Sequence, residues 1–366
     1  MKTIRRLIYR EVIVGVAFVT LAFLALFFFF DLVDELRWVG SNGYRMSHAL
    51  LFVALSLPQH LYELLPITVL IGTIFVMARL AQSSEFTIMR TSGLGPWRAL
   101  STLLALGCAF VALTFAVGDY LAPISERAAA LVRAQQLGQI STGATGAWLK
   151  ERQGDHSFAV NVRALTPDGH MRDVRVFEFD ARGRVASTTV AAQATFDDSG
   201  DAWNLEQVKR SVFEQRPNGD IRVTRRQEPT LLLHTRISPD MVAASLLKPD
   251  KMATIGLFHY IRHLEANGQS AQRYEIEFWR KVFYPLSCLV MVVLALPFAY
   301  LHFRSGGIAT YVFGGVMAGI SFFLLNNVFG YIGTLQTWSP WLTAAAPGLL
   351  YSLLSLTAFT WLVLRR

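Results

Sequence analysis

Residues 305–364 read SGGIATYVFGGVMAGISFFLLNNVFGYIGTLQTWSPWLTAAAPGLLYSLLSLTAFTWLVL, sixty residues without a Lys, Arg, Asp or Glu. A helix needs about 20 apolar residues to cross the roughly 30 Å hydrocarbon core of a bilayer. This stretch is therefore too long for one crossing and suits two. A turn is predicted between them at 330–340, where Gly333, Gln336, Ser339 and Pro340 interrupt the apolar run.

Four more apolar runs lie upstream of this stretch, at Val12–Phe30, Leu64–Ala78, Ala99–Gly118 and Val282–Phe303. Together they predict six transmembrane helices, three in residues 1–121 and three in residues 280–366, with a polar insert at 122–279 between the two sets. A cleaved signal peptide is the alternative for the first run. The run is longer than a typical signal core, and Asp31–Glu35 follows it in place of a small-residue cleavage site, so we expect a retained first span.

The composition and the charge distribution agree with a membrane protein. Hydrophobic residues make up 53% of the 366 residues and charged residues 16%, which excludes a disordered chain. Cys108 and Cys288 both lie in apolar runs, which argues against a disulfide scaffold. The insert holds 20 of the 34 Lys and Arg and 19 of the 26 Asp and Glu, so the net charge of +8 comes almost wholly from the membrane portion. This distribution indicates membrane topology and not a nucleic-acid footprint.

Basic residues near the span ends predict the orientation. Arg79, Arg90 and Arg98 lie between spans 2 and 3, Arg304 lies between spans 4 and 5, and both termini are basic. With six spans all four segments fall on one side, which we expect to be the cytoplasm. The insert then lies outside it. Arg280 and Lys281, at the outer end of span 4, depart from this rule.

Within the insert, a pattern of short strands and turns begins at Ala147. Strands are expected at 158–162, 174–179, 203–208, 221–224 and 230–234, separated by glycine-containing turns. The pattern is typical of an all-β sandwich or jelly roll at about 140–236. Helices are expected on either side of it, at 123–137 and 254–280. The predicted fold class is an α-helical polytopic membrane protein with six transmembrane helices and an inserted all-β, jelly-roll-like domain.

Motifs for catalysis are absent. The chain has no phosphate-binding P-loop, no His-Glu-x-x-His and no Gly-x-Ser-x-Gly. His259 and His263 lie four residues apart, but no third ligand accompanies them, so a solvated helix face is favoured over a zinc site. We therefore expect a chain that is not an enzyme and that holds no cofactor or metal of its own.

The loop at 79–98 carries the strongest local signal. Ser83 or Ser84 is a candidate N-cap for a short helix whose first turn holds Glu85, and Gly93 is a candidate for its end. Apolar residues at 86, 88 and 89 would be exposed on this helix unless something covers them. One alternative is a helix lying in the lipid headgroups. The other is a docking helix for a cytoplasmic partner, which the acid among the apolar residues favours.

Polar and small residues in and beside the spans suggest further roles. Arg37, Arg45, Arg127 and Arg133 follow spans 1 and 3, where they either contact ordinary headgroups or bind an anionic headgroup that carries phosphates. Asn326 and Asn327 lie in mid-span 5 and are expected to make helix–helix hydrogen bonds. Gly315-x-x-x-Gly319 is typical of close helix packing. The spans lack a central acid, which argues against an ion-coupled carrier.

Several stretches together resemble one known family. They are the loop LAQSSEFTIMRTSG (80–93), Ala122-Pro123 after span 3, GLFHY (256–260) through RY (273–274), WRKVFYPL (279–286) and NNVFG (326–330). The chain resembles the YjgP/YjgQ permease family of the lipopolysaccharide export system over essentially its whole length. Its details look more like the G-type subunit than the F-type paralogue.

The resemblance implies a non-catalytic permease of the bacterial inner membrane. Such a subunit pairs with an F-type permease, with two cytoplasmic ATPase subunits that hold ATP and Mg, and with a single-span C subunit. The assembly extracts lipopolysaccharide from the outer leaflet of the inner membrane and passes it through the β domains to a periplasmic bridge. No nucleic acid is expected as a partner.

The resemblance also implies roles for individual residues. Glu85 would be the coupling acid, with Phe86 and Met89 in the ATPase groove and Arg90 beside them. Arg37 and Arg133 would contact lipopolysaccharide, with Arg45 and Arg127 as further candidates. Spans 1 and 5 would line lateral gates, which places Gly315, Gly319, Phe322 and Asn326 at a gate or a packing surface. The chain departs from the family pattern at three basic positions, where it has Asp31, Trp38 and Gln59.

A membrane scaffold that tethers a periplasmic β domain without transporting anything is the alternative function. A scaffold would need neither a docking loop at 79–98 nor the small residues of span 5, so the sequence favours the transporter.

Overall fold

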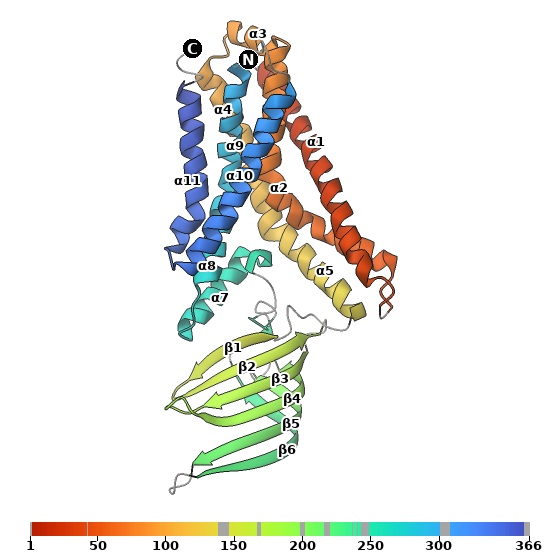
Figure 1. Cartoon of the computed structure of the whole chain (residues 1–366), viewed down its shortest axis with the longest axis vertical. Helices are drawn as coiled ribbons and strands as arrows, with labels where there is room; N and C mark the ends of the chain where they lie inside the picture. The colour runs from red at the N-terminus through yellow and green to blue at the C-terminus, as the bar shows by residue number, and fades with distance from the viewer. Residues whose placement is uncertain are drawn as a thin grey trace. The chain divides into compact units, whose positions relative to one another are not determined.

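The computed structural model describes residues 2–41, 43–137, 146–166, 170–197, 202–215, 220–235, 237–239, 241–242, 249–300 and 308–361 (Figure 1). The chain divides into two compact units. The helical unit comprises Met1–Glu35, Val53–Glu126 and Glu275–Arg366. The second unit comprises Leu36–Phe52 and Arg127–Tyr274 and contains the sheet.

Six helical segments of the described chain are long and apolar enough to cross a membrane, which confirms the predicted number of spans. They are Lys2–Trp38, Met46–Gln82, Pro96–Arg133, Gln272–Tyr300, Ala309–Leu335 and Pro340–Phe359. Three precede the strands and three follow them, as Figure 1 shows. The predicted turn between the last two spans falls between Leu335 and Pro340.

The helices of these segments have the following bounds. The first three spans contain α1 (Lys2–Glu35) with η1 (Leu36–Trp38), α2 (Met46–Gln82), and α4 (Pro96–Ala116) with η2 (Val117–Leu121) and α5 (Ala122–Leu137). The short helix α3 (Glu85–Thr91) connects α2 to α4. The last three spans contain α8 (Gln272–Phe283), η4 (Tyr284–Leu286), α9 (Ser287–Ala295) and η5 (Leu296–Tyr300), then α10 (Ile308–Leu335), then α11 (Pro340–Phe359).

Helix α2 is the centre of the helical unit. Of its most apolar window 83% is buried, against 17% for α1 and 22% for α10. Helix α1 crosses α2 at Gly72, where an added Cβ would lie 2.7 Å from both the backbone N and the Cα of Val16. One turn further along, the Thr20 hydroxyl donates to the Thr68 hydroxyl at 2.9 Å. The two backbones therefore nearly touch, as small residues permit in membranes.

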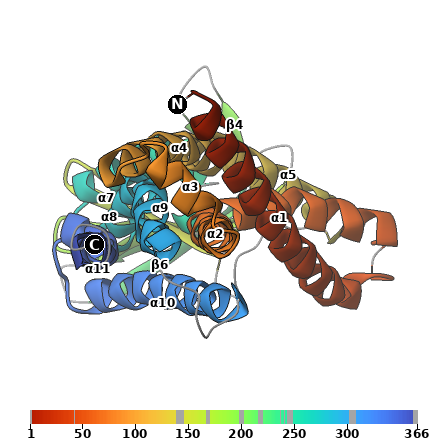
Figure 2. The same ribbon diagram turned by 90° about the horizontal axis from the view of Figure 1, so that it is seen from above.

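Helix α10 packs on the opposite side of α2. An added Cβ on Gly315 would lie 2.7 Å from Cδ1 of Ile74, and one on Gly319 would lie 2.7 Å from Cγ2 of Ile67. At about 100° per residue, both isoleucines lie some 200° around α2 from Gly72, and Figure 2 shows α1 and α10 at different sides of α2. The predicted close-packing motif of span 5 is thus confirmed, and α2 is the span that it packs against.

In the described residues of the insert, the strands form one six-stranded antiparallel sheet. Its strands are β1 (Ala147–Gln153), β2 (His156–Leu165), β3 (Met171–Phe179), β4 (Val185–Asp197), β5 (Ala202–Gln215) and β6 (Ile221–His234), in sequential order across the sheet. Leu149, Val160 and Val176 stand opposite one another on β1, β2 and β3, and all three are buried. The predicted all-β domain is confirmed.

The sheet differs from the prediction in its topology and its strand lengths. The strands form one meander, where two packed sheets of a sandwich were expected. Strands β1 and β4 were not among the predicted strands, and in β4 the Ala, Ser and Thr residues give little hydrophobic contrast. The two strands expected at 221–224 and 230–234 are one strand, β6. Pro229 lies within β6, which is an edge strand in the described sheet, the place where a proline costs no ladder hydrogen bond.

Helices flank the sheet in the sequence, as predicted. Helix α5 leads toward it, whereas η3 (Pro249–Lys251) and α7 (Thr254–Ala266) follow it. Two side chains tie the segments after the strands to the sheet: the Trp203 indole donates to the carbonyl of Ile237 at 2.7 Å, and the backbone N–H of Arg152 donates to Asn267 Oδ1 at 2.9 Å.

Candidate functional site

The predicted loop helix is present as α3, a helix of seven residues between α2 and α4. Ser84 is the N-cap, with a left-handed φ of 61°, but no side chain makes the predicted capping hydrogen bond. Gly93 ends the helix with φ 99°. The N–H of Gly93 donates to the carbonyl of Arg90 and that of Leu94 to the carbonyl of Met89, which is the paired hydrogen-bond pattern of a glycine C-cap. The role predicted for Gly93 is thus confirmed.

One face of α3 is packed into the helical unit. Phe86 is 2% exposed and Met89 is 6% exposed, and both belong to the main hydrophobic core. The Phe86 ring meets the ring of Tyr300, at the end of η5, edge to face with centroids 5.1 Å apart. The guanidinium of Arg90 lies 4.9 Å from the centre of the same Tyr300 ring. Helix α3 is therefore fixed to span 4 by aromatic and cation–π contacts.

The other face of α3 is open. Glu85, Thr87, Ile88 and Arg90 are exposed, and Ile88 has an exposed fraction of 63%. The sequence could not distinguish the apolar side chains at 86, 88 and 89. The structure places Phe86 and Met89 inward and leaves Ile88 outward. Phe86 and Met89 therefore lie against this chain's own core instead of on the exposed face, and Ile88 is the apolar side chain that a partner could contact.

Helix α3 lies at the same end of the helical unit as the start of α1 and the end of α11 (Figure 1). The rings of Trp97 in α4 and Phe359 in α11 are 5.8 Å apart at this end. The predicted basic segments at the N-terminus and at 79–98 thus meet at one end of the spans, as the charge pattern requires.

The four candidate arginines belong to the second compact unit. Arg37 and Arg45 lie in its segment Leu36–Phe52, and Arg127 and Arg133 lie on α5. Arg37, Arg45 and Arg127 are exposed, whereas Arg133 is half-buried.

Arg133 stacks on two aromatic rings. Its guanidinium lies 5.2 Å from the centre of the Trp38 ring and 5.2 Å from that of Phe52. Trp38, which we named above as a departure from the resemblance, thus holds this cation against its aromatic face. Sequence reasoning noted Trp38 as a departure and missed its contact with Arg133.

The other two departures also have partners. The carboxylate of Asp31 in α1 lies 2.6 Å from Nε2 of His60 in α2, and Gln59 Nε2 donates to Glu63 at 2.7 Å. The ring of Phe27 lies 4.9 Å from the His60 ring. Asp31 therefore makes a polar contact between spans 1 and 2, whose partner could not be predicted from the sequence.

The two basic residues at the outer end of span 4 are both satisfied within the helical unit. Arg280 donates to Glu277 at 3.2 Å and to Asn327 of α10 at 3.3 Å. Lys281 is only 4% exposed, and its Nζ donates to the carbonyl of Gly118 at 3.1 Å. Gly118 lies in η2, a π-helical turn, and such turns free carbonyls from the helical ladder. These charges therefore serve packing, which explains their departure from the topology rule.

The remaining candidates in span 5 divide between packing and hydrogen bonding. Phe322 is 1% exposed and meets Tyr351 of α11 edge to face at 5.1 Å, so it is a core residue. Asn326 donates to the carbonyl of Phe322 in its own helix, which corrects the expected interhelical bond. Asn327 makes that kind of bond, with Arg280, because its side chain points toward α8.

Among the described residues no group of three or more His, Cys, Asp or Glu could hold a metal ion. His259 is exposed, and His263 stacks on Tyr260 with ring centroids 6.3 Å apart.

Comparison with known proteins gives consistent matches along the chain. Residues 6–363 match the family described as lipopolysaccharide export system permease LptF/LptG. The chain is 29% identical over 336 residues to the lipopolysaccharide export system permease protein LptG of Escherichia coli K12, an alignment that covers 91% of this chain and 90% of that protein. It is 29% identical over 357 residues to LptG of Haemophilus influenzae, covering 97% and 96% of the two chains.

Proposed function

The chain belongs to the LptF/LptG family of lipopolysaccharide export system permeases, and from that premise we propose that it is the G-type half of an ATP-driven lipopolysaccharide exporter. The family assignment and the six apolar spans establish a transmembrane permease of the inner membrane that acts in lipopolysaccharide transport. This confirms the predicted family, fold class and general function, and it favours transport over the tethering scaffold.

We further propose that both termini and α3 face the cytoplasm and that the sheet lies in the periplasm. The basic segments gathered at the α3 end support this orientation, since cytoplasmic ends of spans are enriched in Lys and Arg. The near-neutral insert agrees with it. Hydrolysis of ATP, with its Mg, takes place in two separate ATPase subunits on the α3 side, and this chain acts as their membrane partner.

The observation that carries the proposal is the two-faced packing of α3. Its open face presents Glu85 and Ile88, with Arg90 at the edge where its guanidinium also contacts Tyr300, which suits a groove with an apolar centre and charged edges. On its buried face, Phe86 and Met89 pack into the core beside Tyr300. When an ATPase bound to the open face moves α3, the movement is therefore transmitted directly to span 4, because no flexible linker separates the docking surface from the core.

The route of the lipid is proposed from the second unit and from the two most exposed spans. Arg37, Arg45, Arg127 and Arg133 supply the cations for a phosphorylated headgroup, since guanidinium groups bind phosphate through two parallel hydrogen bonds. Helices α1 and α10 are the least buried spans and lie on opposite sides of α2. Their open faces suit lateral gates shared with the F-type permease. A single-span C subunit joins the same assembly.

The test is a charge reversal on the open face of α3. Glu85→Lys in the complete complex is expected to reduce the amount of co-purified ATPase by about tenfold or more, because a like charge at a docking surface costs several kcal/mol. Release of lipopolysaccharide from vesicles should fall with it. Thr87→Ala is the matched control, since Thr87 is also exposed on α3 and carries no charge. Normal ATPase recovery with full transport in Glu85→Lys would refute the coupling role.

A further inference from the structure

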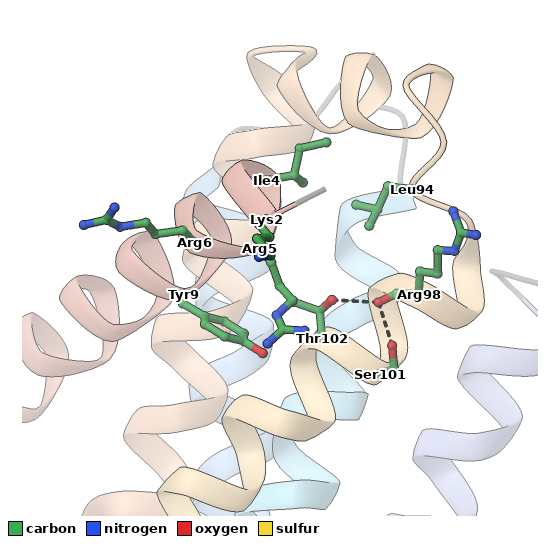
Figure 3. A pocket seen from close by; sticks show the side chains of 9 residues that line it. All are labelled: Lys2, Ile4, Arg5, Arg6, Tyr9, Leu94, Arg98, Ser101 and Thr102. Atoms are coloured by element: carbon green, nitrogen blue, oxygen red, sulfur yellow. Dashed lines mark hydrogen bonds between the residues drawn. The ribbon is translucent and has the colours of Figure 1, made fainter.

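A cavity of about 500 Å³ opens at the α3 end of the helical unit, between the first turns of α1 and α4. The residues lining it are Lys2, Ile4, Arg5, Arg6, Tyr9, Leu94, Arg98, Ser101 and Thr102 (Figure 3). None of its lining residues belongs to the open face of α3, to the four candidate arginines or to the predicted gate residues. No role predicted from the sequence uses it.

The lining is strongly cationic. Four of its side chains are Lys or Arg, and none of the lining residues carries a carboxylate. Arg5 extends past Tyr9 toward Thr102, whereas Arg6 points away from the other lining side chains in Figure 3. The Arg5 guanidinium lies 5.6 Å from the centre of the Tyr9 ring. The acid nearest in the sequence, Glu11, is hydrogen-bonded to Arg79 of α2. The cavity therefore favours an anion, and Arg5 and Lys2 are the groups placed to meet it.

The other lining atoms narrow the chemistry of that anion. The Ser101 and Thr102 hydroxyls both donate to the carbonyl of Arg98, at 3.0 and 2.8 Å, so their oxygens are left as acceptors. Ile4, Leu94 and the face of Tyr9 add apolar surface. A ligand that fits has a negative group for the cations, a hydroxyl or ammonium donor for Ser101 and Thr102, and an apolar portion. Inorganic phosphate lacks the apolar portion.

The position of the cavity indicates what the apolar portion of the ligand is. Its α1 wall ends at Tyr9, and the uncharged run Val12–Phe30 begins one turn later. That places the lining cations at the depth of lipid headgroups. We propose that the cavity is a binding site for an anionic glycerophospholipid of the adjoining leaflet, whose phosphate binds Arg5 and Lys2 and whose headgroup hydroxyls donate to Ser101 and Thr102.

A lipid bound at this site would stabilise the C-terminal end of α3. Leu94 lines the cavity and follows the glycine C-cap of α3, and Arg98 Nη1 donates to the carbonyl of Gly93 at 3.2 Å. A lipid seated against Leu94 and Arg98 holds the turn that fixes the end of α3. This inference requires only that the α3 end meets a membrane surface, and it does not depend on the coupling role of Glu85.

The test measures lipid retention by the complete complex. The purified complex is titrated with phosphatidylglycerol, and native mass spectrometry gives the apparent affinity for the first bound molecule. Arg5→Gln is expected to weaken that affinity by about tenfold, since it removes one charge-assisted contact. Arg10→Gln is the matched control, because it removes the same charge from the same helix outside the cavity. It should change the affinity less than twofold.

Three results would overturn the proposal. Equal losses in Arg5→Gln and Arg10→Gln would show diffuse electrostatic attraction and no site. Displacement of the lipid by millimolar inorganic phosphate would show a soluble-anion site. Loss of the ATPase from Arg5→Gln with unchanged lipid binding would assign the cavity to protein docking. Glu85→Lys should leave lipid binding unchanged, so failure of the coupling proposal and failure of this one can be told apart.

Discussion

The contact between α1 and α2 at Gly72 makes a quantitative prediction about how the chain holds its first span. In Gly72→Ala the new methyl group would lie 2.7 Å from the backbone N and Cα of Val16, where ordinary contact begins near 3.4 Å. Backbone atoms cannot rotate away, so α1 must move by about 0.7 Å to restore ordinary contact. Overpacking of this kind costs about 1–3 kcal/mol.

Two further contributions determine the net change in the free energy of unfolding of Gly72→Ala. Displacing α1 also stretches the hydrogen bond between Thr20 and Thr68, which is 2.9 Å long, and bonds of this kind within membranes average about 0.6 kcal/mol. Alanine is the better helix former by about 1 kcal/mol, which offsets part of the loss. The expected result is a net destabilisation of about 0.5–2.5 kcal/mol.

Gly314→Ala is the matched control, because Gly314 is exposed in α10 and an added Cβ there meets nothing within 4 Å. This variant gains helix propensity and loses no contact, so it should be neutral or slightly stabilised. Thermal unfolding of the two variants in the same detergent measures the difference. The reasoning is refuted if Gly72→Ala unfolds at or above the temperature of Gly314→Ala.

Three further predictions follow from the contacts of α3, span 4 and α5. Phe86→Ala leaves a cavity beneath α3 and should lower the free energy of unfolding by about 3–5 kcal/mol, whereas Ile88→Ala, on the exposed face, should change it by less than about 0.5 kcal/mol; equal thermal shifts would contradict the observed packing. Lys281→Met removes the donor to a buried carbonyl and should destabilise the chain by about 1–3 kcal/mol in the same assay, so an unchanged midpoint would show that another donor replaces it. Arg133→Glu should reduce photocrosslinking to lipopolysaccharide several-fold, with Arg133→Lys intermediate; unchanged crosslinking in both would restrict Arg133 to its aromatic contacts.

The spans could be predicted from the sequence because their signal is local. A long uncharged run such as 305–364 is expected to form membrane-spanning helices, whatever the rest of the chain does, because a helix satisfies its own backbone hydrogen bonds within the lipid. Strand β4 and the continuity of β6 were harder to predict. Small polar residues hide the alternation of β4, and the proline of β6 is tolerated only because that strand lies at an edge.

The sequence predicted which residues belong to the site better than it predicted how their side chains are arranged. Helix α3, its acid and its terminal glycine follow from residues 83–93 alone. Which of its apolar side chains faces inward depends on Tyr300, more than two hundred residues away. The contacts of Trp38 with Arg133 and of Asp31 with His60 are long-range in the same way, so single departures from a family pattern become interpretable only with a structure.

The edge strand β6 has a consequence for the chain before it is assembled. A single open sheet exposes rows of unpaired backbone groups at its outer strands, which invites polymerisation with other copies. Strand β6 carries Arg222, Arg225, Arg226 and Glu228, most of its side chains are exposed, and Pro229 interrupts its row of donors. Charges and a proline on an edge are the usual obstacles to strand-by-strand aggregation. The proline that makes β6 look like two strands therefore also places an obstacle to strand pairing at this edge of the described sheet.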